Sequence, residues 1–175
     1  MCIRDRADRV GANDGAAYTL FLNTDGTVAA FNEISDGIGG LPAGTLDPGD
    51  LFGSGADGAG DINGDGIDDF LVGARNDDTG GTNRGAMHIL YMTATGQVGH
   101  HQLVADGFSG IAANTLADGD GFGWAGVAPV GDIDGNGTID FATGALRDDD
   151  AGVDTGSAPP ASMTSKMPSP SESRS

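Results

Sequence analysis

The chain has 175 residues and a net charge of −18, and it contains 32 glycines but only 6% aromatic residues. This length suits a single domain, and the composition predicts short strands and turns rather than long helices. The charge would repel a phosphate backbone, which argues against nucleic acid as a partner, and no apolar run approaches the roughly 20 residues that a membrane span needs.

The acidic residues are almost all aspartates. Of the 26 acidic side chains, only Glu33 and Glu172 are glutamates. Asp favours turns, caps and metal-binding loops, whereas Glu favours helices. A solvated acidic surface and a cation-binding role both remain open on composition alone. Cys2 is the only cysteine, so an internal disulfide is excluded.

Two strands are predicted first along the chain, at AAYTLFL (16–22) and TVAAFNEI (27–34). The turn NTDG lies between them and places Asp25-Gly26 where a hairpin needs residues that tolerate a positive φ. The pattern therefore predicts a β-hairpin.

Four further strands are predicted, a weaker one at 53–60 and stronger ones at 69–74, 86–92 and 97–104. None of the intervening segments has the pattern of a helix. Four strands per unit without a helix is typical of a β-propeller blade.

The chain repeats itself internally. An offset of 70 places Gly26 on Gly96 and Asp50 on Asp120, and an offset of 71 then places Asp61 on Asp132. The same register aligns AAYTLFLNTDGTV (16–28) with AMHILYMTATGQV (86–98). A period of this length indicates a repeat architecture in which each unit is one small sheet.

Each of the two repeats contains an acidic nonapeptide, DINGDGIDD at 61–69 and DIDGNGTID at 132–140. Oxygen-bearing side chains stand at positions 1, 3, 5 and 9, and position 7 offers its main-chain carbonyl. The predicted metal ligands are therefore Asp61, Asn63, Asp65, Ile67 and Asp69 in the first copy, and Asp132, Asp134, Asn136, Thr138 and Asp140 in the second.

Glycine at position 6, Gly66 and Gly137, permits the sharp turn that would fold these oxygens around one hard cation such as Ca²⁺. One alternative is a flexible Asp/Asn/Gly turn without an ion. Another is a helix-loop-helix calcium site, but its chelating carboxylate at position 12 is replaced by Val72 and Thr143.

The order of these motifs resembles the FG-GAP repeats of integrin α-subunit propellers and of large bacterial surface and secreted proteins. Phe52-Gly53, the acidic loop and Val72-Gly73-Ala74 carry the resemblance in one copy, and Phe122-Gly123, the second loop and Gly144-Ala145 carry it in the other. The resemblance implies a propeller of about seven four-stranded blades, Ca²⁺ held in the loops, and an extracellular or cell-surface setting. It also implies protein or glycan ligands, and neighbouring blades supplied by a longer parent chain.

We therefore expect an all-β fold, a partial β-propeller of about two to two and a half four-stranded FG-GAP blades. The expected segments are a non-native-looking stub at 1–9, the second half of a preceding blade at 10–50, a full repeat at 51–120, an incomplete repeat at 121–157 and a disordered or frameshifted tail at 158–175. No secretory signal is visible in MCIRDRADR.

Other candidate sites are weaker. GSGADG (53–58) fits a phosphate-loop pattern but precedes no helix, and the sequon at Asn136 competes with the metal role of that residue. His100-His101 lies on a predicted strand without a third ligand at suitable spacing, which favours a structural role. Phe122 and Trp124 are expected to pack between blades.

No residues form a catalytic arrangement, so an enzyme is not expected. The sequence favours a non-catalytic, calcium-stabilised adhesion or protein-interaction module, with a calcium affinity on the order of 10⁻⁴ to 10⁻³ M. The alternative is an accessory propeller of a larger secreted hydrolase. A weaker third possibility is an enzyme site within the propeller itself.

Overall fold

The structure is a computed structural model that describes residues 13–148. Eight β-strands and no helix occur in this range. The strands are β1 (Ala17–Leu22), β2 (Val28–Ile34), β3 (Phe52–Gly60), β4 (Asp69–Ala74), β5 (Ala86–Met92), β6 (Val98–Ala105), β7 (Phe122–Gly131) and β8 (Asp140–Ala145).

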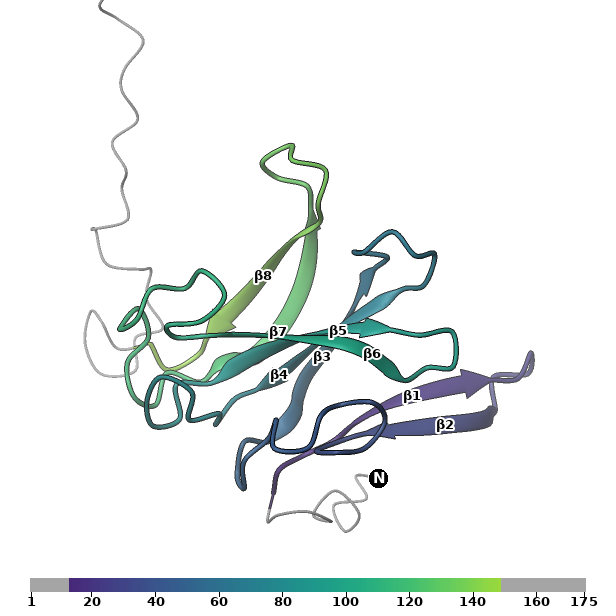
Figure 1. Ribbon diagram of the computed structural model, residues 1–175, viewed down its shortest axis with the longest axis horizontal. Helices are drawn as coiled ribbons and strands as arrows, with labels where there is room; N and C mark the ends of the chain where they lie inside the picture. Colours follow the sequence, from purple (N-terminus) through teal and green to yellow (C-terminus); the bar gives the residue numbers. More distant parts are fainter. Residues whose placement is uncertain (1–12, 149–175) are drawn as a thin grey trace, which may run out of the picture.

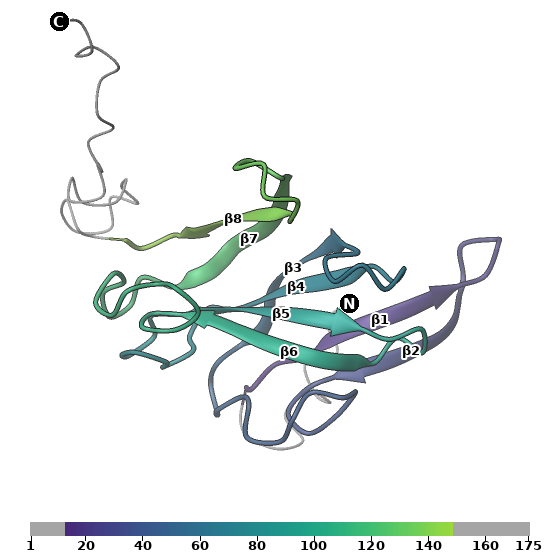
Figure 2. The same ribbon diagram turned by 45° about the horizontal axis from the view of Figure 1, so that its top comes forward.

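The strands form three separate antiparallel sheets. The central sheet has four strands in the order β3-β4-β5-β6, and a two-stranded sheet lies on each side of it, β1-β2 and β7-β8. Figures 1 and 2 show the three sheets fanned out side by side, in chain order. This arrangement confirms the predicted all-β, partial β-propeller fold.

Most of the predicted strands agree with the structure to within one residue. The segments at 69–74 and 86–92 coincide with β4 and β5, and the glycine-rich segment at 53–60 forms the long strand β3. Hydrogen bonds between neighbouring strands compensate for the poor strand propensity of this glycine-rich segment. The absence of any helix between residues 13 and 148 excludes the helix-loop-helix alternative.

Two apolar clusters hold the sheets together. On one face of the central sheet, Leu90 and Met92 are buried in a cluster that includes Ile34 from β2. On the other face, Met87 and Ile89 are buried with Val127 from β7. Because successive side chains of a strand point to opposite faces, β5 contributes to both clusters.

Glycines allow the sheets to approach closely. A Cβ on Gly73 of β4 would lie 2.1 Å from the carbonyl oxygen of Gly123 of β7, and a Cβ on Gly53 would lie 2.4 Å from the carbonyl oxygen of Ala16. Both distances are far below van der Waals contact. The glycine of the FG pair therefore meets the backbone of the preceding blade, which gives the FG and GA motifs a packing role.

The predicted stub at 1–9 and tail at 158–175 lie outside the described residues. The segment boundaries at 10–50, 51–120 and 121–157 stay predictions. Within residues 13–148, no helix has the length and apolar character needed to span a bilayer.

Candidate metal centre

The two acidic loops occupy equivalent places in the fold. Residues 61–68 connect β3 to β4, and residues 132–139 connect β7 to β8. In Figure 1 both loops project from the upper ends of their sheets. The offset of 71 residues in the sequence thus corresponds to two loops at the same end of neighbouring blades.

In the first loop, the carboxylate of Asp61 organises the backbone. Its Oδ1 accepts hydrogen bonds from the amides of Gly64 (2.7 Å) and Asp65 (3.0 Å), and its Oδ2 accepts one from Gly66 (2.8 Å). Gly66 has a φ of +87°, a conformation that L-residues rarely adopt. These contacts fold the loop inward around its first aspartate.

The second loop repeats these contacts. Asp132 Oδ1 accepts from Gly135 (2.7 Å) and Asn136 (3.0 Å), and its Oδ2 accepts from Gly137 (2.9 Å), whose φ is +90°. The side chain at position 3 accepts from the amide at position 5 in both loops, as does position 5 from position 7. Both sequences therefore specify the same local fold.

Three carboxylates converge in the second loop. One ligand atom from each of Asp132, Asp134 and Asp140 lies within 4.8 Å of the others, and no other such group of acidic, His or Cys side chains occurs within residues 13–148. Ca²⁺ lies about 2.3–2.6 Å from its oxygen ligands, so two ligands of one ion lie at most about 5 Å apart. The donor set consists of oxygen atoms alone and suits a hard divalent cation.

The remaining predicted ligands lie in the same two loops. Asn63 donates a hydrogen bond from Nδ2 to Oδ2 of Asp65 (3.0 Å). Ile67 and Thr138 occupy position 7, where their amides donate to the position-5 side chains. That the carbonyl oxygens of Ile67 and Thr138 are metal ligands stays a prediction. The same holds for the ten residues as a ligand set.

The ninth position differs between the loops. Asp69 is fully buried, and its carboxylate accepts from the amide of Met92 on β5 (2.9 Å) and from Ile62 (3.1 Å). Asp140 is half-buried and accepts from Ile133 (2.7 Å). Strand β5 thus holds the Asp69 carboxylate in place through the Met92 amide. Among the described residues, β8 pairs only with β7, so no equivalent strand holds Asp140.

His88 is a buried side chain that the sequence reading did not single out. It is 0% exposed on β5, its Nδ1 lies 2.9 Å from His101 Nε2, and the two rings stack. Burial, with a smaller contribution from the neighbouring His101, lowers the pKa of His88 to about 3. The pairing of β5 with β6 creates this contact, so His101 has a histidine neighbour 13 residues away in sequence.

Two further aspartates are buried, and one of them lies beside His88. Asp77 Oδ2 lies 3.9 Å from His88 Nε2, and both Asp77 and Asp50 are nearly inaccessible to solvent. Burial, with a smaller contribution from the negative charge of Asp77, raises the pKa of Asp50 to about 7. Burial likewise raises the pKa of Asp77. These acids are structural, since backbone amides of Asp47 and Thr79 donate to them.

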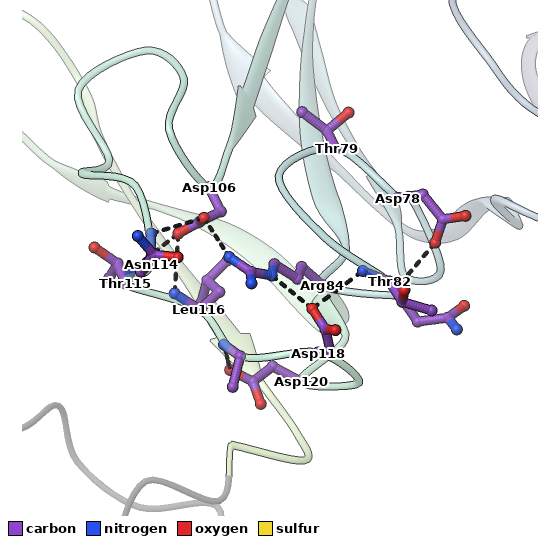
Figure 3. Close-up of polar contacts among 12 residues, drawn as sticks. Asp78, Thr79, Thr82, Arg84, Asp106, Asn114, Thr115, Leu116, Asp118 and Asp120 are labelled. Atoms are coloured by element: carbon purple, nitrogen blue, oxygen red, sulfur yellow. Dashed lines mark hydrogen bonds and ion pairs between the residues drawn. The ribbon is translucent and has the colours of Figure 1, made fainter.

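Arg84 lies in the loop between β4 and β5 and contacts the loop between β6 and β7 (Figure 3). These loops connect the strand ends opposite the acidic loops. The Arg84 guanidinium donates from Nη1 to Asp106 (2.6 Å) and from Nε to Asp118 (2.9 Å). Asp106 also accepts from the amides of Asn114, Thr115 and Leu116, and these hydrogen bonds lower its pKa against the opposing effect of burial. Asp36 accepts from the amides of Thr45 and Leu46 in the same way.

The repeat alignment already contained a signal for these structural aspartates, because Asp36-Gly37 aligns with Asp106-Gly107. Neither aspartate belongs to an acidic loop, so a metal role does not explain why the two copies share it. The shared backbone hydrogen bonds of Asp36 and Asp106 do explain it. Trp124 of β7 contacts two arginines that follow other strands, since the guanidinium carbons of Arg75, after β4, and Arg147, after β8, lie 4.3 and 4.9 Å from its ring centroid. Phe122 packs against the second apolar cluster.

Comparison with known protein families supports the relationship suggested by the motifs. Residues 52–90 match the model of the FG-GAP repeat family. This segment runs from the first residue of β3 into β5 and includes the first acidic loop. A comparison with curated proteins gives no match.

Proposed function

We propose that this chain, whose residues 52–90 form an FG-GAP repeat, is a calcium-stabilised, non-catalytic propeller module of an extracellular or cell-surface protein. Its partners would be protein or glycan ligands, together with further blades of a longer parent chain. The family match supports the interaction role. The convergence of Asp132, Asp134 and Asp140 is the observation that carries the calcium assignment.

The proposed ligands are the side chains at positions 1, 3, 5 and 9 of each loop and the carbonyl at position 7. They are Asp61, Asn63, Asp65, Ile67 and Asp69, and Asp132, Asp134, Asn136, Thr138 and Asp140. Bound Ca²⁺ would offset the mutual repulsion of the three carboxylates in each loop. The backbone hydrogen bonds to Asp61 and Asp132 orient the loops toward that role.

The ions would then stabilise loops at one end of the blades and leave the sheets to present the binding surface. The affinity should be on the order of 10⁻⁴ to 10⁻³ M, as in other extracellular modules.

Calorimetric titration of the full chain with Ca²⁺ tests the proposal. We expect two bound ions, with one site lost in Asp61→Asn and the other in Asp132→Asn. Asp25→Asn is the matched control, because Asp25 is an exposed turn aspartate that accepts from the Thr27 amide (2.9 Å) in the β1-β2 hairpin. Unchanged binding heat in both loop variants would refute the ligand assignment.

A further inference from the structure

Two arginines converge on the only tryptophan of the chain, where the central sheet meets the β7-β8 sheet. Trp124 lies near the start of β7, and the guanidinium carbons of Arg75 and Arg147 lie 4.3 and 4.9 Å from its ring centroid. Arg75 directly follows β4, and Arg147 comes two residues after β8. The Arg75–Trp124–Arg147 cluster therefore joins two blades, at the strand ends opposite the acidic loops.

The two arginines of this cluster lack acidic partners. Between residues 13 and 148, Arg75, Arg84 and Arg147 are the only arginines, and no lysine occurs there. Arg84 pairs with Asp106 and Asp118, whereas neither Arg75 nor Arg147 forms an ion pair with a described residue. Two like charges held beside one ring repel each other, and a bound anion would offset this repulsion.

The backbone that presents Trp124 recurs in the preceding repeat, where the side chain is much smaller. Its counterpart at the offset of 70 is Ser54. The Trp124 amide donates to the carbonyl of Gly121 (3.1 Å), and the Ser54 amide donates to the carbonyl of Leu51 (3.1 Å). A serine therefore suffices at this position of the repeat, and the fold does not require the indole.

The same is true of Arg147, whose counterpart at the offset of 71 is Asn76. The Arg147 amide donates to the carbonyl of Asp120 (3.1 Å), and the Asn76 amide donates to the carbonyl of Asp50 (3.1 Å). These aspartates recur in both repeats, but the tryptophan and the arginine do not. The cluster is therefore an addition to the shared framework of the repeats.

The cluster is accessible, and a neighbouring blade does not cover the equivalent positions. Arg147 is exposed, and Trp124 and Arg75 are partly exposed. The central sheet has a sheet packed on each of its faces (Figure 1), yet Ser54 and Asn76 stay partly exposed in it. The accessibility of the cluster thus does not depend on where the described residues end.

We propose that the Arg75–Trp124–Arg147 cluster binds the carboxylate of an Asp or Glu side chain of a protein partner. This inference rests on the proposed interaction role, but not on calcium. Each guanidinium is a planar fork that can donate two parallel hydrogen bonds to one carboxylate. Stacking on the indole restricts both guanidinium groups, so less conformational freedom is lost when the carboxylate binds.

Charge and residue type favour a protein carboxylate over a polyanion. The net charge of −18 would repel a nucleic acid or a chain of acidic sugars, because their many charges extend beyond two arginines. A single acidic side chain confines its charge to the cluster. Trp and Arg are also enriched among the residues that contribute most to binding at protein interfaces.

The fluorescence of Trp124 tests the proposal, since no other tryptophan contributes to it. The full chain is titrated with the peptide Gly-Gly-Glu-Gly-Gly, acetylated and amidated so that Glu carries its only charge. Concentrations up to about 50 mM cover dissociation constants weaker than millimolar. The control peptide has Gln in place of Glu, at equal ionic strength. We expect a saturable change in emission with the Glu peptide, and at least about tenfold weaker binding of the Gln peptide. Equal responses would overturn the proposal.

Variants locate the binding. Arg75→Gln and Arg147→Asn should each weaken binding of the Glu peptide at least about tenfold. Asn is the residue that the preceding repeat has at the position of Arg147, so this variant should fold like the wild type. Arg75→Lys keeps the charge without the planar fork and should bind more weakly than the wild type but more tightly than Arg75→Gln. Arg174→Gln removes the same charge outside the described residues and should bind like the wild type. Unchanged affinity in both Arg75→Gln and Arg147→Asn would refute the site.

An oligogalacturonate tests the other source of carboxylates, an acidic glycan. At equal carboxylate concentration it should bind more weakly than the Glu peptide, and tighter binding would overturn the assignment to a protein partner. Failure of both ligands would overturn the site itself. The calcium proposal is judged separately, by the calorimetric titration of Asp61→Asn and Asp132→Asn.

Discussion

The two acidic loops share one hydrogen-bond pattern but differ in what surrounds them. The first belongs to a four-stranded sheet, where Met92 of β5 donates to a fully buried Asp69. The second belongs to a two-stranded sheet, where Asp140 is half-buried and converges with Asp132 and Asp134. The local sequence thus determines how each loop folds, whereas the third strand determines how firmly its last aspartate is held.

This difference separates two roles for the same residue type. Both oxygens of Asp69 accept backbone amides, so its carboxylate connects the loop to the neighbouring strand. Asp140 makes only the loop contact among the hydrogen bonds of the described residues. Asp69 should therefore stabilise the fold more strongly, and Asp140 should depend more on a bound cation for its position.

The largest expected effect is on the free energy of unfolding in Asp69→Asn. The Asn side chain has one oxygen and one NH₂ group, so either the Ile62 amide or the Met92 amide would face a donor instead of an acceptor. This should lower the free energy of unfolding by about 2–4 kcal/mol. Asp140→Asn should cost less than about 1 kcal/mol because that site is partly solvated. Urea denaturation in the presence of a chelator measures both variants without a metal contribution. Equal losses of unfolding free energy in Asp69→Asn and Asp140→Asn would show that the contact with β5 does not make Asp69 more important for stability than Asp140.

A smaller effect is expected from calcium removal, and it should differ between the loops. Chelation should increase amide exchange at Gly135 and Gly137 more than at Gly64 and Gly66, because the second loop lacks support from a third strand. With free Ca²⁺ at about ten times the dissociation constant, the ions should stabilise each site by about 1.4 kcal/mol. Hydrogen-exchange mass spectrometry with and without chelator measures this difference. Greater deprotection of the first loop would contradict it.

The smallest expected effect is the pH dependence caused by Asp50, which lies before the central sheet. Its pKa is raised to about 7 in the folded state, so the folded protein binds the proton more tightly than the unfolded chain. The resulting stabilisation is present below about pH 4 and is lost as the pH rises through 7. Asp50→Asn should therefore be more stable than the wild type at pH 8, by about 1 kcal/mol, and should show little gain at pH 4.

Thermal unfolding of Asp50→Asn and of the neighbouring variant Asp47→Asn at both pH values measures this effect. Asp47 is exposed, and its amide donates to Asp50 (2.7 Å). Its variant should change the pH dependence less. The wild-type profile also contains His88, whose lowered pKa acts in the opposite direction and removes stability as the pH falls from about 6.5. The comparison between variants isolates Asp50 from that contribution.

Much of the fold was predictable because its signals are local. The short apolar runs at 69–74 and 86–92, the turn residues at Asp25-Gly26, and the spacing from Asp61 to Asp69 each depend on residues within about ten positions of one another. The hydrogen bonds of Asp61 and Asp132 stay within their own loops, so the sequence specified them directly. The internal repeat then extended these local predictions from one copy to the next.

The contacts of Asp69, His88 and Arg84 were not predictable in this way. Asp69 meets Met92 at a separation of 23 residues, and Arg84 meets Asp118 at a separation of 34. Strand pairing and the packing of neighbouring blades create these contacts, and no short sequence pattern encodes them. The sequence by itself determined the repeat, the strands and the oxygen-rich loops. The tertiary structure decided which aspartates are buried as structural acceptors and which bring their carboxylates together in an exposed loop, because burial depends on the neighbouring strands.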